Sequence, residues 1–254
     1  MSDLLDLRGK KALVTGGSRG VGRATALLLA RAGADVGIGF RTRIEEAGET
    51  VAELSSLGAK AWAEGGDLGD SGDASRLFER ADQEFDGLDI FVGNAGIWPP
   101  EDIAIAEMTD AHWRRTMQAN LDSIFYTTRE AAKRIRDGGR IVLVSSTAGQ
   151  RGEAFHADYA ASKGALISMV KGLCVELGPK GITVNCVAPG WIDTEMANPA
   201  FGDGRKESIA KSIPIGRIPP PEDVAGPILF LCSQLARHIT GEILNVNGGA
   251  VLVG

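Results

Sequence analysis

The stretch KALVTGGSRGVGRATALLLARAG, from Lys11 to Gly33, decides the fold of this chain. Lys11–Thr15 is a short apolar run that predicts a buried strand, and Gly20–Ala32 has the length and period of a helix that ends at Gly33. Between them lies a glycine-rich turn. Glycines let backbone N–H groups approach a phosphate at the start of a helix, where the helix dipole favours negative charge. A strand, a glycine turn and a helix in this order predict a dinucleotide site.

The same alternation of strand and helix continues along the chain. Further apolar runs predict strands at Val36–Phe40, Lys60–Glu64, Leu88–Val92, Arg140–Val144, Ile182–Val187 and Glu242–Val246. Segments of helical period are Ile44–Leu57, Ser71–Phe85, Ala111–Arg136, Tyr159–Leu177 and Pro221–Ser233. Right-handed crossovers between such strands predict an α/β, doubly wound Rossmann fold, with a parallel sheet of about seven strands and helices on both faces. Ligands then bind at the carboxyl ends of the strands.

One segment departs from this alternation. Pro189–Pro220 is long, rich in glycine and proline and weakly periodic, with a short helix expected at Lys206–Lys211. A long irregular segment in a compact domain is usually a functional lid or is disordered. No change in composition marks a second domain. We therefore expect residues 1–254 to form a single dinucleotide-binding domain, with a lid around residues 190–220.

Composition argues against several other classes of protein. The net charge is −6, and Lys and Arg are interspersed with acids, so no basic stripe for nucleic acid is present. The first residues lack the pattern of a secretory signal, and no apolar run approaches the roughly 18 residues that span a membrane. The cysteines and histidines show no metal-ligand spacing. These patterns predict a cytoplasmic protein without a metal site.

Arginines, rather than an acid, follow the second predicted strand. A carboxylate about 20 residues beyond the glycine turn would bind the ribose hydroxyls of NAD, but this strand ends in Gly39-Phe40-Arg41-Thr42-Arg43. An acid would repel a 2′-phosphate, whereas the guanidinium groups of Arg19 and Arg41 can form paired hydrogen bonds to it. Both arginines could instead be solvated side chains. The pattern predicts NADP(H) in preference to NAD(H).

Tyr159 and Lys163 form a candidate acid/base pair because they are four residues apart and share one face of a predicted helix. Bringing a phenol from a pKa near 10 to neutrality needs about 4 kcal/mol, and one positive charge at about 4 Å supplies about this much at an effective dielectric of 20. Lys163 together with a cationic nicotinamide is therefore expected to lower the pKa of Tyr159. A buried tyrosine beside a surface lysine is the alternative. Ser145-Ser146 ends the most apolar strand. A hydroxyl there can hydrogen-bond a substrate carbonyl oxygen, which favours the catalytic interpretation.

In order and spacing, these motifs resemble the short-chain dehydrogenase/reductase family from Lys11 to Gly249. The resemblance is carried by T-G-x-x-x-G-x-G at residues 15–22, Asn-Ala-Gly at 94–96, Y-x-x-x-K at 159–163 and Pro-Gly at 189–190. The family usually has Asn-Asn-Ala-Gly at these positions, and Gly93 departs from its first asparagine. The resemblance implies hydride transfer between a nicotinamide and a carbonyl or alcohol. Its catalytic residues would be Asn120, Ser146, Tyr159 and Lys163, with Ser145 a weaker candidate than Ser146.

The resemblance also implies a role for each site residue. Ser146 and Tyr159 would polarise the carbonyl, Tyr159 would exchange the proton, and Asn120 would hold a water in the proton path. Lys163 would lower the pKa of Tyr159 and bind the nicotinamide ribose. Cofactor contacts are implied for Gly16, Ser18, Arg19, Gly20, Val21, Gly22, Arg41, Asp67, Leu68, Asn94, Ala95, Gly96, Tyr159, Lys163, Pro189, Gly190, Ile192 and Thr194.

Several substrates remain compatible with these motifs. The chain looks most like the 3-oxoacyl-thioester reductases of fatty-acid synthesis, and Arg134, Arg136 and Lys180 lie near positions where those enzymes meet an acidic acyl carrier protein. Basic residues at helix ends also complement the helix dipole. Dehydrogenases of sugars, polyols, steroids and small ketones share the catalytic motifs. A non-catalytic NADP(H)-binding regulator and a structural subunit are alternatives of another class.

The resemblance further implies assembly into a homotetramer. Family members usually associate through the segments that correspond to residues 111–136 and 159–177 and through the C-terminal strand. The tail Asn247–Gly254 is apolar, so we expect it to be held at a subunit contact.

Overall fold

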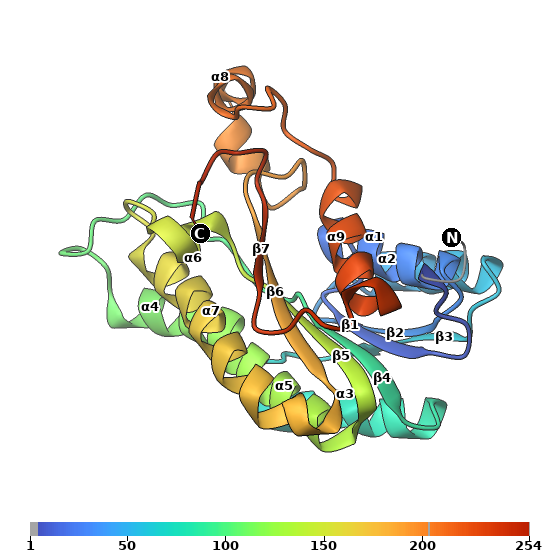
Figure 1. Cartoon of the computed structure of the whole chain (residues 1–254). Coiled ribbons are helices and arrows are strands. Elements are labelled where there is room, and N and C mark those ends of the chain that lie inside the picture. The colour runs from blue at the N-terminus through green and yellow to red at the C-terminus, as the bar shows by residue number, and fades with distance from the viewer. Residues whose placement is uncertain (1–4, 203, 254) are drawn as a thin grey trace.

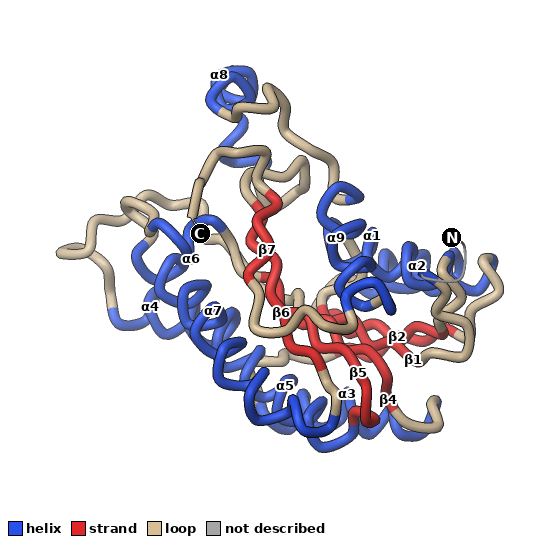
Figure 2. The backbone as a smooth tube through the Cα atoms, viewed as in Figure 1, coloured by secondary structure: helices blue, strands red, loops and turns tan. Residues whose placement is uncertain are grey.

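The computed structural model describes residues 5–202 and 204–253, and its centre is a seven-stranded parallel sheet (Figure 1, Figure 2). The strands are β1 (Lys11–Thr15), β2 (Asp35–Phe40), β3 (Ala61–Gly65), β4 (Leu88–Gly93), β5 (Ile135–Val144), β6 (Thr183–Pro189) and β7 (Ile243–Val246). Their order is β3-β2-β1-β4-β5-β6-β7, and each neighbouring pair is parallel. The chain winds from the middle of the sheet to one edge and then to the other. The predicted doubly wound fold is confirmed.

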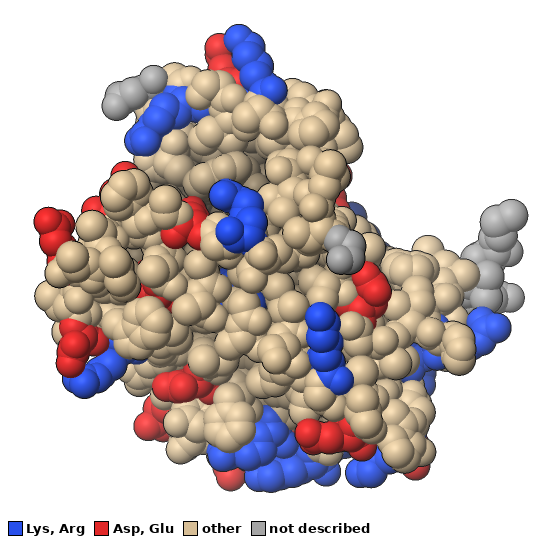
Figure 3. Space-filling view, turned by 60° about the vertical axis from the view of Figure 1, so that its left-hand side comes forward, with Lys and Arg blue, Asp and Glu red and all other residues tan. Residues whose placement is uncertain are grey.

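Helices cover both faces of this sheet (Figure 1). On one face lie α1 (Gly20–Arg31), α2 (Ile44–Ser56) and α9 (Glu222–Cys232). On the other lie α3 (Ser71–Glu84), α5 (Ser123–Arg134) and α7 (Ala157–Leu177). Figure 3 shows basic and acidic side chains interspersed over the face of the molecule that it presents. Within the described residues, no helix combines the length and the apolar character needed to cross a bilayer.

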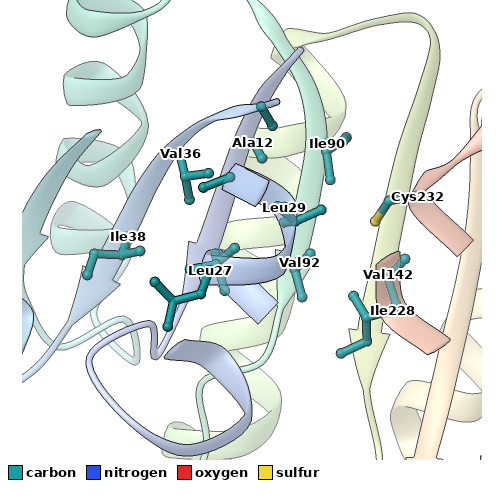
Figure 4. Close-up of a cluster of buried hydrophobic side chains, with 14 of the residues drawn as sticks. Ala12, Leu27, Leu29, Val36, Ile38, Ile90, Val92, Val142, Ile228 and Cys232 are labelled. Atoms are coloured by element: carbon teal, nitrogen blue, oxygen red, sulfur yellow. The ribbon is translucent and has the colours of Figure 1, made fainter. Parts of the chain in front are cut away.

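The central strands are apolar without interruption because both of their faces are buried. Ala12 and Val14 of β1 belong to the core under α1, α2 and α9, whereas Leu13 between them belongs to the core under α3, α5 and α7. Figure 4 shows the first of these cores, in which Leu27 and Leu29 of α1 lie over the side chains of the sheet. Two packed cores hold the carboxyl ends of the strands in register.

The predicted helix over residues 111–136 is interrupted in the structure. It consists of α4 (Asp110–Met117), a π-helical turn η2 (Gln118–Asp122) and α5, after which β5 begins at Ile135 instead of Arg140. A π turn is a single wider turn within a continuous helix, and the segments on both sides of it keep a helical period, so the sequence pattern does not reveal it. Residues 136–138 of β5 are exposed, and this part of the strand lacks the buried run that predicts a strand.

The remaining predicted strands and helices begin and end within two residues of their predicted bounds. The structure adds a short helix, α6 (Thr147–Arg151), directly after β5. It also adds the short 3-10 turns η3 (Gly178–Lys180) and η5 (Gln234–Ala236).

The segment predicted as a lid follows β6. It contains a 3-10 turn η4 (Asn198–Phe201) and α8 (Arg205–Ser212), and α8 projects beyond the sheet at the top of Figure 1. α8 is one residue longer at each end than predicted, and Lys206 Nζ donates to Asp193 Oδ2 at 2.7 Å, which ties α8 to the start of the segment. Asp203 of the predicted lid, Gly254 of the predicted contact tail and residues 1–4 of the predicted domain lie outside the described residues.

Candidate active site

A cleft of about 480 Å³ runs along the carboxyl ends of the strands. From the strand order, residues that follow β3 and β2 lie at one end of it, and residues that follow β5 and β6 lie at the other. The predicted site residues that line the cleft are Gly16, Ser18, Arg19, Gly20, Val21, Arg41, Asp67, Leu68, Asn94, Ala95, Gly96, Ser146, Tyr159, Lys163, Pro189, Gly190, Ile192 and Thr194. The other two predicted site residues, Gly22 and Asn120, do not line the cleft. Gly22 packs against Gly16, and Asn120 hydrogen-bonds to Ile97 and Ser162.

The turn between β1 and α1 requires glycine at several positions. Gly16 and Gly20 have φ values of +67° and +54°, in the left-handed region that favours glycine. A Cβ atom at Gly22 would lie 2.1 Å from the carbonyl oxygen of Gly16. No side-chain hydrogen bond caps the start of α1 at Arg19, so the first N–H groups of this helix can bind phosphate oxygens. The turn therefore fits the diphosphate of a dinucleotide.

Asn94 fastens this turn to the end of β4. Its Nδ2 donates to the carbonyl oxygen of Thr15 at 2.9 Å, and Thr15 Oγ1 accepts the N–H groups of Asn94 and Ala95 at 3.0 Å each. Gly93, the residue that departs from the family pattern, lies where a Cβ atom would be 2.8 Å from the Leu143 side chain. A larger residue at position 93 would therefore crowd β5.

Three arginines lie at the end of the cleft beside β2. Arg19 Nη1 and Arg43 Nη2 both donate to Glu195 Oε2, at 2.6 and 3.2 Å, and Arg41 Nη1 is 3.9 Å from Asp67 Oδ2. All five side chains line the cleft and are about half exposed. The guanidinium groups can therefore reach a phosphate bound there. The sequence analysis assigned Arg19 and Arg41 but not Arg43, although Arg43 belongs to the same basic stretch.

The start of the lid segment closes the cleft over the glycine turn. The N–H of Gly190 donates to the carbonyl oxygen of Val246 at 3.2 Å, and a Cβ atom at Gly190 would lie 3.2 Å from the Asn247 side chain. Thr194 lies next to the turn, because a Cβ atom at Gly20 would be 3.5 Å from its methyl group. The segment after β6 thus contacts the start of α1.

Ser146 and Tyr159 come together at the middle of the cleft. Ser146 caps α6, where its Oγ accepts the N–H of Ala148 at 3.1 Å, and its hydroxyl is hydrogen-bonded to that of Tyr159 in the first turn of α7. The hydroxyl of Ser145 instead donates to the carbonyl oxygen of Lys163 at 2.7 Å. The two adjacent serines therefore have different partners, and Ser146 is the one that meets the phenol.

Lys163 lies beneath Tyr159, one helical turn further along α7. Its Nζ donates to the carbonyl oxygen of Val144 at 2.9 Å and is 6.0 Å from the centre of the Tyr159 ring. A Cβ atom at Gly96 would lie 3.3 Å from this Nζ atom, so glycine at position 96 leaves room for the ammonium group. The ammonium group thus lies on the wall of the cleft below the phenol.

Asn120 lies in the π turn and is fully buried. Its Oδ1 accepts the N–H of Ile97 at 2.7 Å, and its Nδ2 donates to the carbonyl oxygen of Ile97 at 3.0 Å and to Ser162 Oγ at 3.1 Å. The side-chain amide therefore holds the segment after β4 against α7. This contact is additional to the proton-path role that the resemblance implies.

Burial shifts the pKa values of both Tyr159 and Lys163. Removal from water raises the pKa of Tyr159 to about 12, while the hydrogen bond with Ser146 opposes this rise and the negative charge of Glu153 adds to it. Burial lowers the pKa of Lys163 to about 8. Desolvation of the phenol is the largest cause of the raised pKa of Tyr159. The expected lowering of this pKa relies on Lys163 together with a cationic nicotinamide and stays a prediction.

Aromatic and charged side chains form the end of the cleft beside β5 and β6. Trp98 stacks on His156 with ring centres 4.9 Å apart and meets Trp191 edge-on at 5.8 Å. Glu153 and Arg151, which follow Ser146 along the chain, line the cleft together with both tryptophans. The sequence analysis assigned none of these five residues, because they belong to no motif. Only the strand order, which brings the segments after β4, β5 and β6 together, could have indicated them.

Burial raises the pKa of Glu153, and this rise is opposed by the charge of His156 and by a hydrogen bond with Trp98. Within residues 5–202 and 204–253, no group of three or more His, Cys, Asp and Glu side chains is placed to hold a metal ion.

Comparisons with known proteins agree with this geometry. The family described as enoyl-(acyl carrier protein) reductase matches residues 16–251. The 3-oxoacyl-(acyl-carrier-protein) reductase of Aquifex aeolicus is 38% identical over 96% of this chain and 98% of its own length. L-rhamnose 1-dehydrogenase (NAD(P)(+)) of Azotobacter vinelandii is 36% identical over 94% of this chain and 96% of its own length. A short chain dehydrogenase from Burkholderia cenocepacia, solved in complex with NADP, superimposes with a TM-score of 0.89 and 38% identity, covering 96% of this chain and 98% of that one.

Proposed function

Because the chain belongs to the short-chain dehydrogenase/reductase family and is thus an oxidoreductase of CH–OH and C=O groups, we propose that it transfers a hydride between NADP(H) and a small oxo or hydroxy compound. One observation carries this proposal. The hydrogen-bonded hydroxyls of Ser146 and Tyr159, with Lys163 beneath them, lie in the same cleft as a glycine turn that fits a diphosphate.

The residues of the chain would position the substrate and move its proton. The nicotinamide, when bound, supplies or takes the hydride. A phenol with a pKa of about 12 keeps its proton at neutral pH, so Tyr159 can donate it to the oxygen of a carbonyl that is being reduced. Ser146 holds the phenol and can donate to the same oxygen. The ammonium group of Lys163 then stabilises the phenolate that remains.

NADP(H) is the proposed cofactor, and NAD(H) is the alternative. Support comes from Arg19, Arg41 and Arg43, whose guanidinium groups line the end of the cleft beside β2. They provide charge and hydrogen-bond donors for a 2′-phosphate. The similar dehydrogenase from Burkholderia cenocepacia was solved with NADP.

Two classes of substrate are candidates, and each has separate support. A 3-oxoacyl thioester is supported by the Aquifex aeolicus relative, which is a 3-oxoacyl-(acyl-carrier-protein) reductase. A sugar or polyol is supported by the Azotobacter vinelandii relative, an L-rhamnose 1-dehydrogenase, and by the polar side chains of Arg151 and Glu153 in the cleft.

An acyl carrier protein as partner has weaker support from the surface. Of the basic residues proposed to steer it, Arg134 donates to Asp82 Oδ2 at 2.8 Å and also pairs with Glu130, and Arg136 is 3.3 Å from Asp86 Oδ2. Acids of the chain therefore neutralise much of the charge that an acidic partner would meet.

The proposed assembly is a homotetramer, and the proposed compartment is the cytoplasm. The apolar tail supports a contact between subunits, because the Leu252 side chain is 90% exposed although the tail is held by a hydrogen bond from Asn247 Nδ2 to the Val251 carbonyl oxygen at 3.0 Å. Deletion of residues 251–254 is expected to weaken the assembly.

The test of this function follows NADPH absorbance with a short 3-oxoacyl thioester and, separately, with a panel of sugars and hydroxyketones. Wild-type protein is compared with Tyr159→Phe, and the series is repeated with NADH. Oxidation of NADPH that the variant loses supports the hydride transfer and the role of Tyr159, and the active substrate identifies the class. Tight NADPH binding without turnover of any compound would favour the alternative of a non-catalytic regulator.

A further inference from the structure

The end of the cleft beside β5 and β6 combines a carboxyl group with aromatic walls. Trp98 and Trp191 line it, and the ring of Phe201 packs against Trp191 at 5.8 Å between centres. Glu153 lies in the same wall, half-buried, and accepts a hydrogen bond from Trp98. Glu153 and Tyr159 line the same cleft, and the negative charge of Glu153 adds to the raised pKa of the phenol. A substrate that occupies this end of the cleft is therefore exposed to the carboxyl group.

A carboxylate has about four acceptor positions, and Trp98 supplies one donor. A substrate that enters the cleft takes the place of water around the remaining positions. An unsubstituted alkyl chain would leave those acceptors without a partner, and an unpaired buried acceptor is destabilising. The substrate that fits Glu153 therefore carries a hydrogen-bond donor besides the carbonyl that reacts.

The charges around this wall favour a neutral donor. Arg151 lines the same cleft and Lys163 lies beneath Tyr159, so this end carries positive as well as negative charge. An anionic substituent would be repelled by Glu153, and an ammonium group by Arg151 and Lys163. A hydroxyl group both donates and accepts, so it can pair with the carboxylate and the guanidinium group together.

We propose that Glu153 and Arg151 form a subsite for a hydroxyl group of the substrate, and that Glu153 makes the enzyme select hydroxylated carbonyl compounds over unsubstituted ones. This inference rests on the proposed hydride transfer. It names the substrate class as hydroxyketones or hydroxyaldehydes and the corresponding diols and polyols.

The test compares kcat/KM for 2-butanone with the values for 1-hydroxy-2-butanone and 4-hydroxy-2-butanone, using NADPH. Wild-type enzyme is expected to prefer one of the hydroxylated ketones by about 10- to 100-fold, the range of one hydrogen bond to a charged group. Glu153→Leu is expected to bring the ratio close to one through loss of activity on the hydroxylated ketone. Glu153→Gln, which keeps an acceptor oxygen, is expected to retain part of the preference. Glu107→Leu, at an exposed acid in the segment before α4, is the matched control and is expected to leave the ratio unchanged.

The inference is overturned if wild-type enzyme has nearly equal kcat/KM for the hydroxylated ketones and for 2-butanone. It is also overturned if Glu153→Leu leaves the preference for the hydroxylated ketone unchanged. Failure of the proposed function looks different, because none of the three ketones would then oxidise NADPH. In that case calorimetry on the NADP⁺-loaded protein compares 1,2-butanediol with 2-butanol. Tighter binding of the diol that Glu153→Leu and not Glu107→Leu abolishes supports the subsite without turnover, whereas equal binding of both alcohols contradicts it.

Discussion

Burial shifts the pKa values of both Tyr159 and Lys163 toward their neutral forms. A phenol with a pKa of about 12 favours donation of its proton, and a lysine with a pKa of about 8 is charged through only part of the neutral range. A positively charged nicotinamide beside them would favour the phenolate. The acid/base power of this pair therefore depends on what binds in the cleft.

Replacing Tyr159 with phenylalanine removes the proton donor and leaves the shape of the cleft. We expect kcat to fall by about 10²- to 10⁴-fold, the usual contribution of a general acid, with NADPH affinity retained. Steady-state kinetics and fluorescence titration of NADPH measure the two quantities. Tyr126→Phe is the control, because Tyr126 is the only other tyrosine of the chain and lies on α5 outside the cleft lining. Comparable losses in both variants would contradict the assignment.

The lowered pKa of Lys163 also affects stability. Between about pH 8 and its ordinary value of 10.5, the unfolded chain holds a proton that the folded chain has lost, so the free energy of unfolding rises with pH. Across this whole pH range, the free energy of unfolding rises by roughly 3 kcal/mol because of Lys163. The raised pKa of Tyr159 has the opposite effect and lowers the free energy of unfolding as pH rises. It does so only between pH 10.0, the ordinary pKa of tyrosine, and about pH 12. We expect Lys163→Met to flatten the rise between pH 8 and pH 9.5 in urea unfolding.

The control for this measurement is Lys171→Met, since Lys171 lies exposed on the same helix. It is expected to keep the slope of the wild-type protein. A Lys163→Met variant with an unchanged slope would show that the ammonium group keeps its ordinary affinity for protons in the folded chain.

Residue spacing predicted which side chains lie close together, but not the direction in which their pKa values shift. Tyr159 and Lys163 face one another because four residues make about one helical turn. The sign of the pKa shift of Tyr159 depends on how much water the surrounding loops exclude, and spacing carries no such information. Glu153 and Trp98 could not be predicted for a related reason. They lie in two segments, after β5 and after β4, that only the folded sheet brings together.

At the scale of elements, the glycine turn allows a direct test of backbone contact. Gly22→Ala places a Cβ atom 2.1 Å from the Gly16 carbonyl oxygen, which neither backbone segment can relieve without moving. We expect NADPH affinity to fall at least tenfold, because the turn that receives the diphosphate must shift. Gly48→Ala in α2 is the control, since nothing lies within 4 Å of its Cβ position. That variant is expected to gain about 0.5–1 kcal/mol in unfolding free energy. Normal NADPH binding by Gly22→Ala would contradict this account of the turn.

Glu195 in the lid segment competes for the arginines that would bind a 2′-phosphate. Its carboxylate accepts from both Arg19 and Arg43, so a phosphate must displace it. We expect Glu195→Gln to tighten NADPH binding about two- to fivefold, the range of an exposed ion pair. NADH binding should change less, because NADH lacks the phosphate. Glu207→Gln on α8 serves as the control for a changed net charge. Equal effects on both cofactors would argue against competition.

Most helices and strands could be predicted from the period of hydrophobic residues and from the positions of glycines. The elements that could not be predicted have physical causes. α1 could be predicted because an apolar face and Gly33 mark it. The π turn at Asn120 could not be predicted, since the segments on both sides of it keep a helical period. This turn brings one side-chain amide to the backbone of Ile97. The early part of β5 was missed because its exposed residues lack the pattern of a buried strand.

At the scale of the whole molecule, topology explains why the site forms where it does. The chain passes from β1 to β3 on one side and then from β4 to β7 on the other, so the segments after β1 and β4 diverge and leave a cleft between them. The alternation of strands and helices was sufficient to predict this arrangement.

The helices on the face of α5 and α7 expose large apolar side chains that the single chain does not cover. Val175 of α7 is 74% exposed and Phe125 of α5 is 47% exposed. Large apolar side chains exposed on one face are candidates for contacts between proteins. The proposed tetramer would bury these side chains, so a charge introduced there should separate subunits.

We expect Val175→Glu to lower the mass measured by light scattering from that of four chains while NADPH still binds. Ile44→Glu on α2, at a side chain 71% exposed on the opposite face of the sheet, is expected to keep the mass of four chains. A wild-type protein with the mass of one chain, or a Val175→Glu variant with unchanged mass, would mean that another surface, or none, joins the subunits.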